Sequence, residues 1–234
     1  MKFKKEYLTL YAVTNRVHAV GATLYEQVKE ALDGGVTCVQ LREKYMAEDE
    51  LVREAIRLKE LCNRYGVPLI INDNVDVAIK SGADGVHVGQ EDRSAGEIRE
   101  MMGEDFIIGV TAKTVKQARK AQADGADYIG SGSVFPSPTK QGAIRITKED
   151  LKEICSSVDI PAVAIGGVSL DNMKELEGCG MSGFAVVSAV FAAEDIRAAA
   201  ISLRAEAEAV LLHGDGGAVK EEAGTGLHGK EGEQ

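Results

Sequence analysis

Short apolar stretches alternate with longer amphipathic segments along most of this chain. Eight stretches of strand length lie at residues 8–13, 36–41, 68–71, 85–88, 106–110, 128–130, 161–165 and 184–187. Between them, apolar residues recur with helical spacing, for example at 24–32, 48–65, 115–123 and 170–176. Alternating strands and helices build a parallel sheet. Eight such units within about 200 residues predict a single-domain α/β fold, the (β/α)8 or TIM barrel.

A weak internal repeat supports this count. Before the second, fourth, sixth and eighth stretches, a glycine and a tight turn lead into the strand, in segments that begin at Asp33, Ser81, Asp124 and Cys179. A barrel built from βαβα quarters would repeat in this way. A doubly wound open sheet is the alternative, but it would not require eight units.

The last part of the chain has a different composition. Residues 213–234 are rich in glycine and charge and nearly free of large apolar side chains. Such a segment cannot bury enough apolar surface to fold by itself. We therefore predict a barrel domain at 1–212 and a disordered tail at 213–234.

Composition narrows the class of protein. A net charge of -10 disfavours a broad nucleic-acid surface, although it leaves room for anionic small molecules in a pocket. No apolar run approaches the roughly 18 to 20 residues that span a bilayer, and the N-terminus lacks a signal-peptide pattern, which indicates a cytoplasmic protein. The four cysteines are too scattered for a zinc site or a disulfide framework. The sequence leaves open whether the chain forms a homo-oligomer.

The second apolar stretch ends in unusual polar residues. In a strand, alternate side chains share a face, so Gln40 and Arg42 point one way and Leu41 the other, with Lys44 beyond the end. The pattern directs an amide and a guanidinium into the barrel interior. No acidic residue shares their side of this strand, and a buried charge needs a counter-charge. An anionic ligand would supply one.

Other strand ends carry polar residues as well, and barrels bind ligands at this rim. Asp73 and Asp92 follow neighbouring strands and could share Mg²⁺, which takes one or two carboxylates together with phosphate oxygens. Alternatively, they could cap the helices that begin near Val75 and Ser94.

Three further features have two readings each. Gly166, Gly167 and Ser188 match the usual phosphate site of barrels, or they are turn glycines and a helix cap. The loop at 135–142 could be a lid that carries Lys140, or a plain surface loop. His87 points into the barrel, where a satisfied core histidine is favoured over a general base.

Taken together, seven segments in register resemble the thiamine phosphate synthase (thiamine-phosphate pyrophosphorylase) family. They are Gln-Leu-Arg-Glu-Lys at 40–44, Ile-Asn-Asp-Asn at 71–74, Gly-Val-His-Val-Gly-Gln-Glu-Asp at 85–92, Gly-Val-Thr at 109–111, Val-Phe-Pro-Ser-Pro-Thr-Lys at 134–140, Ile-Gly-Gly at 165–167 and Val-Ser at 187–188. The resemblance covers residues from about 7 to 205. It leaves the tail unmatched.

The resemblance implies roles for individual residues. The pyrimidine diphosphate would be bound by Gln40, Leu41, Arg42, Glu43, Lys44, Asn72, Thr111 and Lys140. The thiazole phosphate would be bound by Ser137, Pro138, Thr139, Gly167, Val187 and Ser188. Asp73 and Asp92 would ligate Mg²⁺, while Arg42, Lys44 and Lys140 would stabilise the leaving diphosphate.

The implied reaction joins the two small-molecule halves of thiamine. Cleavage of the bond to diphosphate would leave a carbocation-like pyrimidine, which the thiazole nitrogen captures to give thiamine phosphate. An isomerase of the same scaffold, which aromatises the thiazole phosphate, is one alternative. A non-catalytic protein that binds thiazole or thiamine phosphate is another. The sequence does not separate biosynthesis from salvage.

Overall fold

The chain closes into a barrel of eight parallel strands, as predicted. In this computed structural model, which describes residues 2–18, 21–136 and 144–214, each strand pairs with the next along the chain and the last pairs with the first. The strands are β1 (Leu10–Val13), β2 (Cys38–Leu41), β3 (Leu69–Asn72), β4 (Gly85–Val88), β5 (Ile107–Thr111), β6 (Tyr128–Ser131), β7 (Ala162–Ile165) and β8 (Gly183–Val186).

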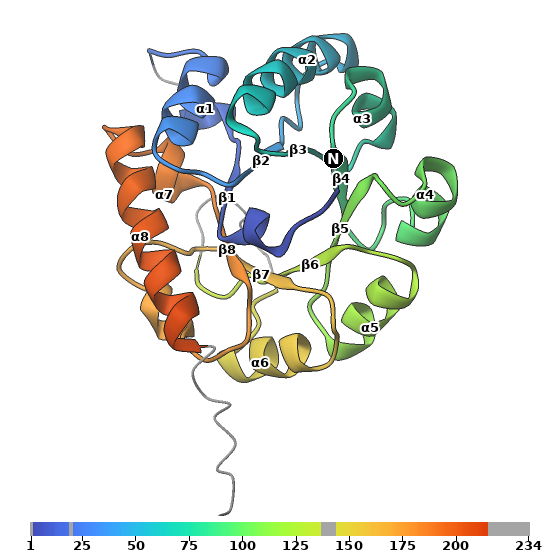
Figure 1. Ribbon diagram of the computed structural model, residues 1–234, viewed down its shortest axis with the longest axis vertical. Helices are drawn as coiled ribbons and strands as arrows, with labels where there is room; N and C mark the ends of the chain where they lie inside the picture. The colour runs from blue at the N-terminus through green and yellow to red at the C-terminus, as the bar shows by residue number, and fades with distance from the viewer. Residues whose placement is uncertain (1, 19–20, 137–143, 215–234) are drawn as a thin grey trace, which may run out of the picture.

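Helices surround the barrel (Figure 1). They are α1 (Leu24–Asp33), α2 (Glu48–Tyr65), α3 (Val75–Ser81), α4 (Ala95–Met102), α5 (Val115–Ala123), α6 (Lys148–Ser156), α7 (Ser188–Phe191) and α8 (Ile196–Gly214), with short 3-10 turns η1 (Lys5–Leu8), η2 (Arg16–His18) and η3 (Met173–Leu176). The chain therefore has helices at 24–33, 48–65 and 115–123, where the spacing predicts them.

The helix predicted at 170–176 is wrong, because only the 3-10 turn η3 forms there. The side chain of Asn172 accepts a hydrogen bond from Ser169 N (2.9 Å) and donates one to Gly167 O (2.9 Å). An asparagine that bonds the neighbouring backbone offers the chain an alternative to the helix.

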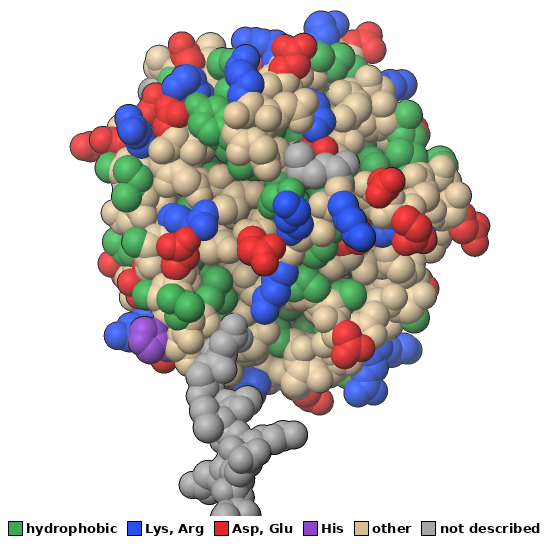
Figure 2. Space-filling model, in the orientation of Figure 1, with side chains coloured by type: hydrophobic (Ala, Val, Ile, Leu, Met, Phe, Trp, Pro, Cys, Tyr) green, Lys and Arg blue, Asp and Glu red, His purple; other side chains and the backbone are tan. Residues whose placement is uncertain are grey.

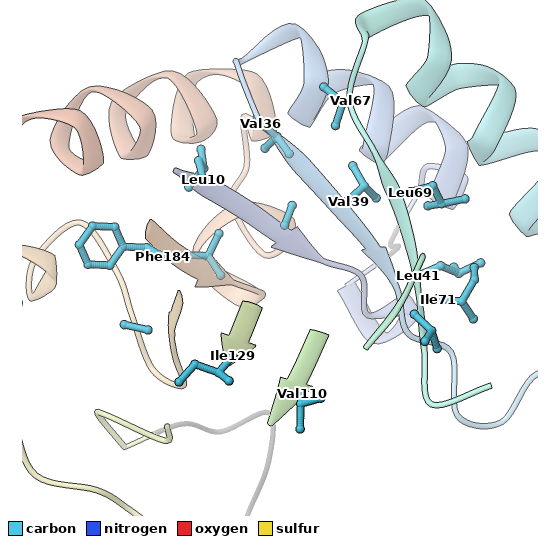
Figure 3. Close-up of a cluster of buried hydrophobic side chains, with 14 of the residues drawn as sticks. Leu10, Val36, Val39, Leu41, Val67, Leu69, Ile71, Val110, Ile129 and Phe184 are labelled. Atoms are coloured by element: carbon cyan, nitrogen blue, oxygen red, sulfur yellow. The ribbon is translucent and has the colours of Figure 1, made fainter. Parts of the chain in front are cut away.

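The main core lies between the strands and the helices (Figure 3). Outward-facing residues of the strands, such as Val39, Leu41, Leu69 and Ile71, are at most 1% exposed. Removing each such side chain from water contributes about 2 kcal/mol to folding. This layer fixes the inward direction of the alternate residues, Gln40 among them.

The amino end of the barrel is filled by aromatic side chains and by the N-terminal segment. Figure 1 shows this first, dark-blue segment crossing the middle of the barrel. The Phe3 ring stacks on Tyr128 inside the barrel, with ring centroids 5.8 Å apart and an interplanar angle of 11°. With this end occupied, the interior space that remains lies towards the carboxyl ends of the strands.

The internal repeat has a structural cause in two of the αβ junctions. Asp84 accepts a hydrogen bond from the N–H of Leu69 (2.8 Å) and pairs with Lys59 (2.7 Å). Asp127 does the same with the N–H of Ile108 (2.7 Å) and pairs with Arg99 (2.8 Å). Each carboxylate ties the start of its own strand to the preceding strand. All four repeats also use a glycine with positive φ before the strand: Gly35, Gly82, Gly125 and Gly180.

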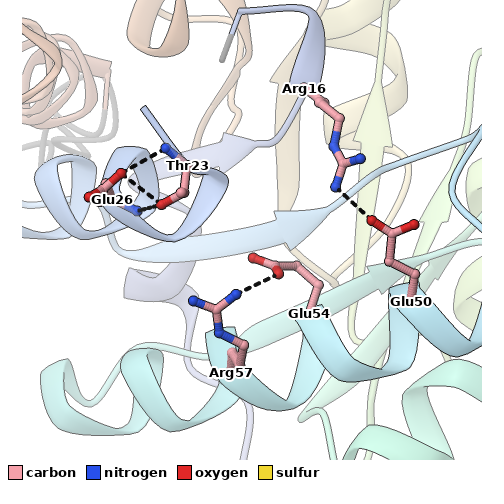
Figure 4. Close-up of polar contacts among 6 residues, drawn as sticks. All are labelled: Arg16, Thr23, Glu26, Glu50, Glu54 and Arg57. Carbon is pink, nitrogen blue, oxygen red and sulfur yellow. Dashed lines mark hydrogen bonds and ion pairs between the residues drawn. The ribbon is translucent and has the colours of Figure 1, made fainter. Parts of the chain in front are cut away.

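Polar contacts hold the first two βα loops (Figure 4). Thr23 and Glu26 form a capping box at the start of α1, with 2.7 Å between Glu26 Oε2 and Thr23 N. Arg16, after β1, pairs with Glu50 in the first turn of α2 (3.4 Å).

Figure 2 shows basic and acidic side chains interspersed on one face of the molecule. Within the described residues, no helix is long and apolar enough to cross a membrane.

Two further sequence-based predictions concern the C-terminal tail and the cysteines. Helix α8 ends at Gly214, and residues 215–234 lie outside the described ranges, so the boundary between barrel domain and tail stays a prediction. The described structure has free cysteines at Cys38, Cys62, Cys155 and Cys179, of which only Cys155 is partly exposed.

Candidate active site

A pocket of about 150 Å³ lies at the carboxyl ends of the strands, and every strand contributes to its lining. Barrel enzymes place their active sites at this end. Seven of the residues predicted for substrate binding line it together: Gln40, Arg42, Asn72, Thr111, Gly167, Val187 and Ser188.

The segment after β2 divides as strand alternation predicts. Gln40 is 4% exposed and lines the pocket with Arg42, whereas Leu41 points outward and packs in the main core. Lys44 lies beyond the strand, is exposed, and is not part of the pocket wall.

Glu43 contacts the loop after β1 rather than the pocket. Its carboxylate accepts hydrogen bonds from Thr14 Oγ1 (3.0 Å) and Arg16 N (3.4 Å). Burial raises the pKa of this carboxyl, and the bonds from Thr14 and Arg16 oppose that rise. Glu43 therefore joins the two loops that carry Arg42 and Arg16.

Asp73 and Asp92 do not cap helices, so that reading is wrong. The cap of α3 is Asn74, which accepts from Val77 N at 3.0 Å, and the cap of α4 is Ser94 in a capping box with Glu97. Each cap lies one or two positions after the aspartate, which leaves both carboxylates available for another role.

The two aspartates are close enough to influence each other. Burial raises the pKa of Asp73, and the neighbouring charge of Asp92 raises it further. Asp73 also has a φ of 61°, a left-handed conformation that costs a non-glycine residue about 1 kcal/mol. Strain and like charge at one point are typical of a site that a ligand completes.

These carboxylates fit a magnesium ion. The described residues contain no group of three or more His, Cys, Asp or Glu side chains that could hold a metal. Magnesium does not need such a cage, because it takes one or two carboxylates and completes its shell with water and phosphate oxygens. Asp92 Oδ2 is steadied by the N–H of Gly89 at 2.7 Å.

The backbone after β7 adopts a conformation that favours glycine at two successive positions. Gly166 and Gly167 have φ values of 97° and 70°. A Cβ on Gly167 would lie 2.3 Å from Pro136 O, and Ser188 is not a cap because the cap position of α7 belongs to Val187. The two glycines are therefore turn glycines, as one of the two interpretations predicts. Gly167 and Ser188 also line the pocket.

Three polar residues of the pocket wall, Tyr11, Lys113 and Ser133, were not singled out by the sequence reasoning. Lys113 lines the pocket two residues beyond β5, and Ser133 lines it two residues beyond β6. The rule of examining residues after each strand could have found both. The inward direction predicted for His87 is confirmed: it lines the pocket, with Nε2 3.0 Å from Thr111 Oγ1 and Nδ1 3.1 Å from Tyr128 OH.

Four of the predicted site residues lie outside the described ranges. They are Ser137, Pro138, Thr139 and Lys140. Their roles, including that of the loop as a lid, stay predictions.

A closed parallel barrel with a polar pocket at the carboxyl ends of its strands defines a barrel enzyme. The sequence profile of the thiamine monophosphate synthase family matches residues 10–190. The chain therefore belongs to this family, and it is a transferase.

Individual relatives agree. The thiamine-phosphate synthase of Methanobrevibacter smithii is 48% identical over 202 residues, 86% of this chain and 96% of that protein. That of Clostridioides difficile is 45% identical over 192 residues, 82% of this chain and 91% of that protein. The solved structure of thiamine phosphate pyrophosphorylase from Pyrococcus furiosus superposes with a TM-score of 0.82 at 40% identity, covering 88% of this chain and 98% of that one.

Proposed function

We propose that this protein joins an aminopyrimidine, whose methylene carries a diphosphate, to a thiazole phosphate, giving thiamine phosphate and diphosphate. The observation that carries the proposal is the pairing of Asp73 with Asp92 next to Asn72, which lines the pocket together with Arg42, although neither aspartate is itself part of the pocket wall. A carboxylate pair next to a guanidinium suits a metal-bound diphosphate, because the metal satisfies the acids and the phosphate oxygens satisfy the arginine.

The described residues divide the two substrates between the two sides of the pocket. Gln40, Arg42, Asn72 and Thr111 come from β2 to β5 and the turn after β2, and they would bind the pyrimidine diphosphate. Gly167, Val187 and Ser188, which follow β7 and β8, would bind the thiazole phosphate. Leu41 and Glu43 would act through the backbone and the loop contacts that position this segment. Ser137, Pro138, Thr139 and Lys140 complete the proposed set from sequence alone.

The proposed reaction is a dissociative substitution. The C–O bond between the pyrimidine methylene and diphosphate breaks, and diphosphate leaves with the electron pair. The aminopyrimidine ring spreads the positive charge, after which the thiazole nitrogen donates its lone pair to form the new C–N bond. Atoms and charge balance without a side-chain nucleophile.

The chain's cations lower the barrier by stabilising the leaving group. Arg42 and Lys44, with Lys140, would face charge that grows on the diphosphate, and a preorganised donor of this kind contributes several kcal/mol. Mg²⁺ held by Asp73 and Asp92 would add positive charge beside the diphosphate oxygens.

The isomerase alternative has a weaker basis. A thiazole phosphate isomerase binds no diphosphate, so it gives no reason for Asp73 and Asp92 to be held together against their mutual repulsion.

The proposal is tested by incubating the purified protein with both substrates and Mg²⁺ and identifying the products. Thiamine phosphate is expected only when both substrates are present. A second reaction with the thiazole phosphate alone tests for isomerisation. Conversion of the thiazole without the pyrimidine would favour the isomerase, and binding of both substrates without any turnover would favour the non-catalytic alternative.

A further inference from the structure

A continuous chain of hydrogen bonds crosses the barrel beneath the pocket. Gln40 Nε2 donates to Tyr11 OH (2.7 Å), and Tyr11 OH lies 2.8 Å from Tyr128 OH. Tyr128 OH lies 3.1 Å from His87 Nδ1, and His87 Nε2 lies 3.0 Å from Thr111 Oγ1. The chain starts and ends at residues of the pocket wall, yet Tyr128 at its middle is not part of that wall.

The barrel is shaped to hold this chain of hydrogen bonds. A Cβ on Gly109 would lie 2.3 Å from Tyr128 OH and 2.5 Å from His87 Nδ1, and a Cβ on Gly130 would lie 2.9 Å from His87 Cε1. Only glycine at these two strand positions leaves room for both rings. Tyr128 is supported from below by its stack with Phe3. Since all surrounding groups are packed, the hydroxyl groups have few alternative orientations.

The first half of the chain has a fixed direction. An amide Nε2 can only donate, so the oxygen of Tyr11 accepts from Gln40 and its own hydrogen is directed onward. The distance of 2.8 Å to Tyr128 OH does not by itself identify the donor. Because Tyr11 already accepts from Gln40, we assign its hydrogen to the oxygen of Tyr128, a better acceptor than the sulfur of nearby Cys38.

The second half follows from the first. The hydroxyl of Tyr128, having accepted from Tyr11, donates to His87 Nδ1, which must carry no hydrogen. A neutral imidazole then carries its hydrogen on Nε2 and donates it to Thr111 Oγ1. The oxygen of Thr111 accepts this bond, so the Thr111 hydroxyl keeps its own hydrogen for another acceptor.

The direction of the chain determines what its two ends offer to a ligand. With one Nε2 hydrogen donated to Tyr11, the orientation of the Gln40 amide is set, and this decides where its acceptor Oε1 points; the second Nε2 hydrogen remains a donor. At the other end, Thr111 offers a hydroxyl hydrogen, a donor. An aminopyrimidine carries the complementary groups, since its amino group donates and its ring nitrogens accept. The corresponding oxo-pyrimidine carries an acceptor where the amino group would be, opposite Gln40 Oε1.

We propose that Tyr11, Tyr128 and His87 are positioning residues that set the orientation of the Gln40 amide and the tautomer of His87, and thereby select an amino- over an oxo-pyrimidine diphosphate. This inference rests on the proposed function, because it concerns the pyrimidine substrate of the same pocket. It assigns a specificity role to residues that need not all touch the substrate. Tyr128 is the clearest case.

Tyr128→Phe tests the proposal, since it keeps the ring stacked on Phe3 and removes only the central hydroxyl. We expect the preference for the amino- over the oxo-pyrimidine diphosphate, measured as the ratio of kcat/KM values, to fall by a factor of about ten or more, the usual effect of mispairing a buried polar group. KM for the pyrimidine substrate should rise, while KM for the thiazole phosphate changes less than about twofold.

Tyr7→Phe is the matched control, because Tyr7 packs in the same cluster at the amino end of the barrel without belonging to the hydrogen-bonded chain. It should keep the wild-type selectivity. If Tyr128→Phe also keeps the wild-type selectivity, or if this variant impairs the use of the amino- and the oxo-pyrimidine equally, the role of Tyr128 is merely structural and the proposal is wrong.

A second measurement does not depend on activity. In ¹⁵N-histidine-labelled protein, the signals of His87, assigned by their loss in His87→Gln, should show a hydrogen on Nε2 and none on Nδ1. Tyr128→Phe should weaken this preference. A hydrogen on Nδ1 in the wild-type protein would mean that the chain runs in the opposite direction and would overturn the proposal. If the wild-type protein turns over neither pyrimidine, the proposed function fails, whereas these signals still decide the direction of the chain.

Discussion

Two acidic side chains, which follow β3 and β4, are held together at a cost. Burial and the charge of Asp92 both raise the pKa of Asp73, and the backbone of Asp73 adopts a left-handed conformation. Neither residue gains a helix cap in return, because Asn74 and Ser94 fill those positions. A bound cation is the simplest compensation for this arrangement.

Asp92→Asn should therefore abolish most metal-dependent turnover without unfolding the protein. Asparagine still accepts the bond from Gly89 N, so the loop is kept, whereas the charge that a divalent cation needs is lost. We expect kcat/KM to fall by roughly 100-fold or more, about 3 kcal/mol. The rate is measured across a Mg²⁺ titration and Tm is measured alongside.

Glu91→Gln provides the control, since Glu91 is an exposed neighbour outside the proposed site. It should leave the Mg²⁺ dependence unchanged. A large drop in Tm for Asp92→Asn, with the turnover of the folded fraction preserved, would mean that Asp92 is a structural residue.

At the residue scale, the sequence could predict which positions face the pocket but not how they are connected. Strand alternation is enough to direct Gln40 inward and Leu41 outward. The hydrogen bond between Tyr11 and Tyr128 joins residues 117 positions apart, so no local sequence pattern predicts it. Each tyrosine by itself is indistinguishable from an ordinary core aromatic residue.

At the scale of helices and strands, buried polar side chains form hydrogen bonds at the junctions between these elements. Arg99 donates to Asp127 and to the carbonyl groups of Gly103, Phe106 and Gly125, and thereby joins α4 to the starts of β5 and β6. The side chains of Arg99 and Asp127 are only 14% and 21% exposed. A pair with so little solvent loses more when it is broken than a surface pair does.

Arg99→Met should destabilise the fold, since it keeps the apolar stem but leaves Asp127 and three carbonyl groups without their donor. We expect a loss of about 2 to 3 kcal/mol in the free energy of unfolding, measured by urea denaturation. Arg16→Met, which removes the partner of Glu50 in a pair whose side chains are 53% and 51% exposed, should cost at most about 0.5 kcal/mol. Equal losses in the two variants would contradict the role assigned to Arg99.

Strands were easier to predict than connecting segments for a physical reason. A parallel strand buried on both faces is mostly apolar, so its sequence is distinctive, and β4 runs over the predicted residues 85–88. Residues 170–176 have apolar positions at helical spacing, but the side chain of Asn172 bonds the backbone of Ser169 and Gly167, which precede the turn. Periodicity does not register such a competing contact.

The whole molecule is a barrel with one end filled and the other open to ligands. Apolar and aromatic residues, including Phe3 and Tyr128, occupy the amino end, and the polar residues lie at the carboxyl end. The sequence could predict the count of eight strands because each unit buries its own apolar run. It could not predict where the N-terminal segment lies, because the stack of Phe3 on Tyr128 joins residues far apart along the chain.

Removal of residues 215–234, the part of the predicted tail at 213–234 that lies beyond α8, tests the predicted domain organisation. The segment is rich in glycine and charge, so it contributes little to the barrel. The shortened protein should match the full chain in kcat, KM and Tm, with Tm within about 2 °C of the full chain. A substantial loss of any of these would mean that the barrel domain extends beyond α8.

The proposed reaction joins a pyrimidine diphosphate to a thiazole phosphate in this pocket with the help of Mg²⁺. The most direct measurement follows thiamine phosphate and diphosphate in the same reaction over time. We predict that the two products appear in equal amounts, only with both substrates, and that chelation of Mg²⁺ stops them together. Diphosphate release without thiamine phosphate, or no release with both substrates bound, would contradict the account.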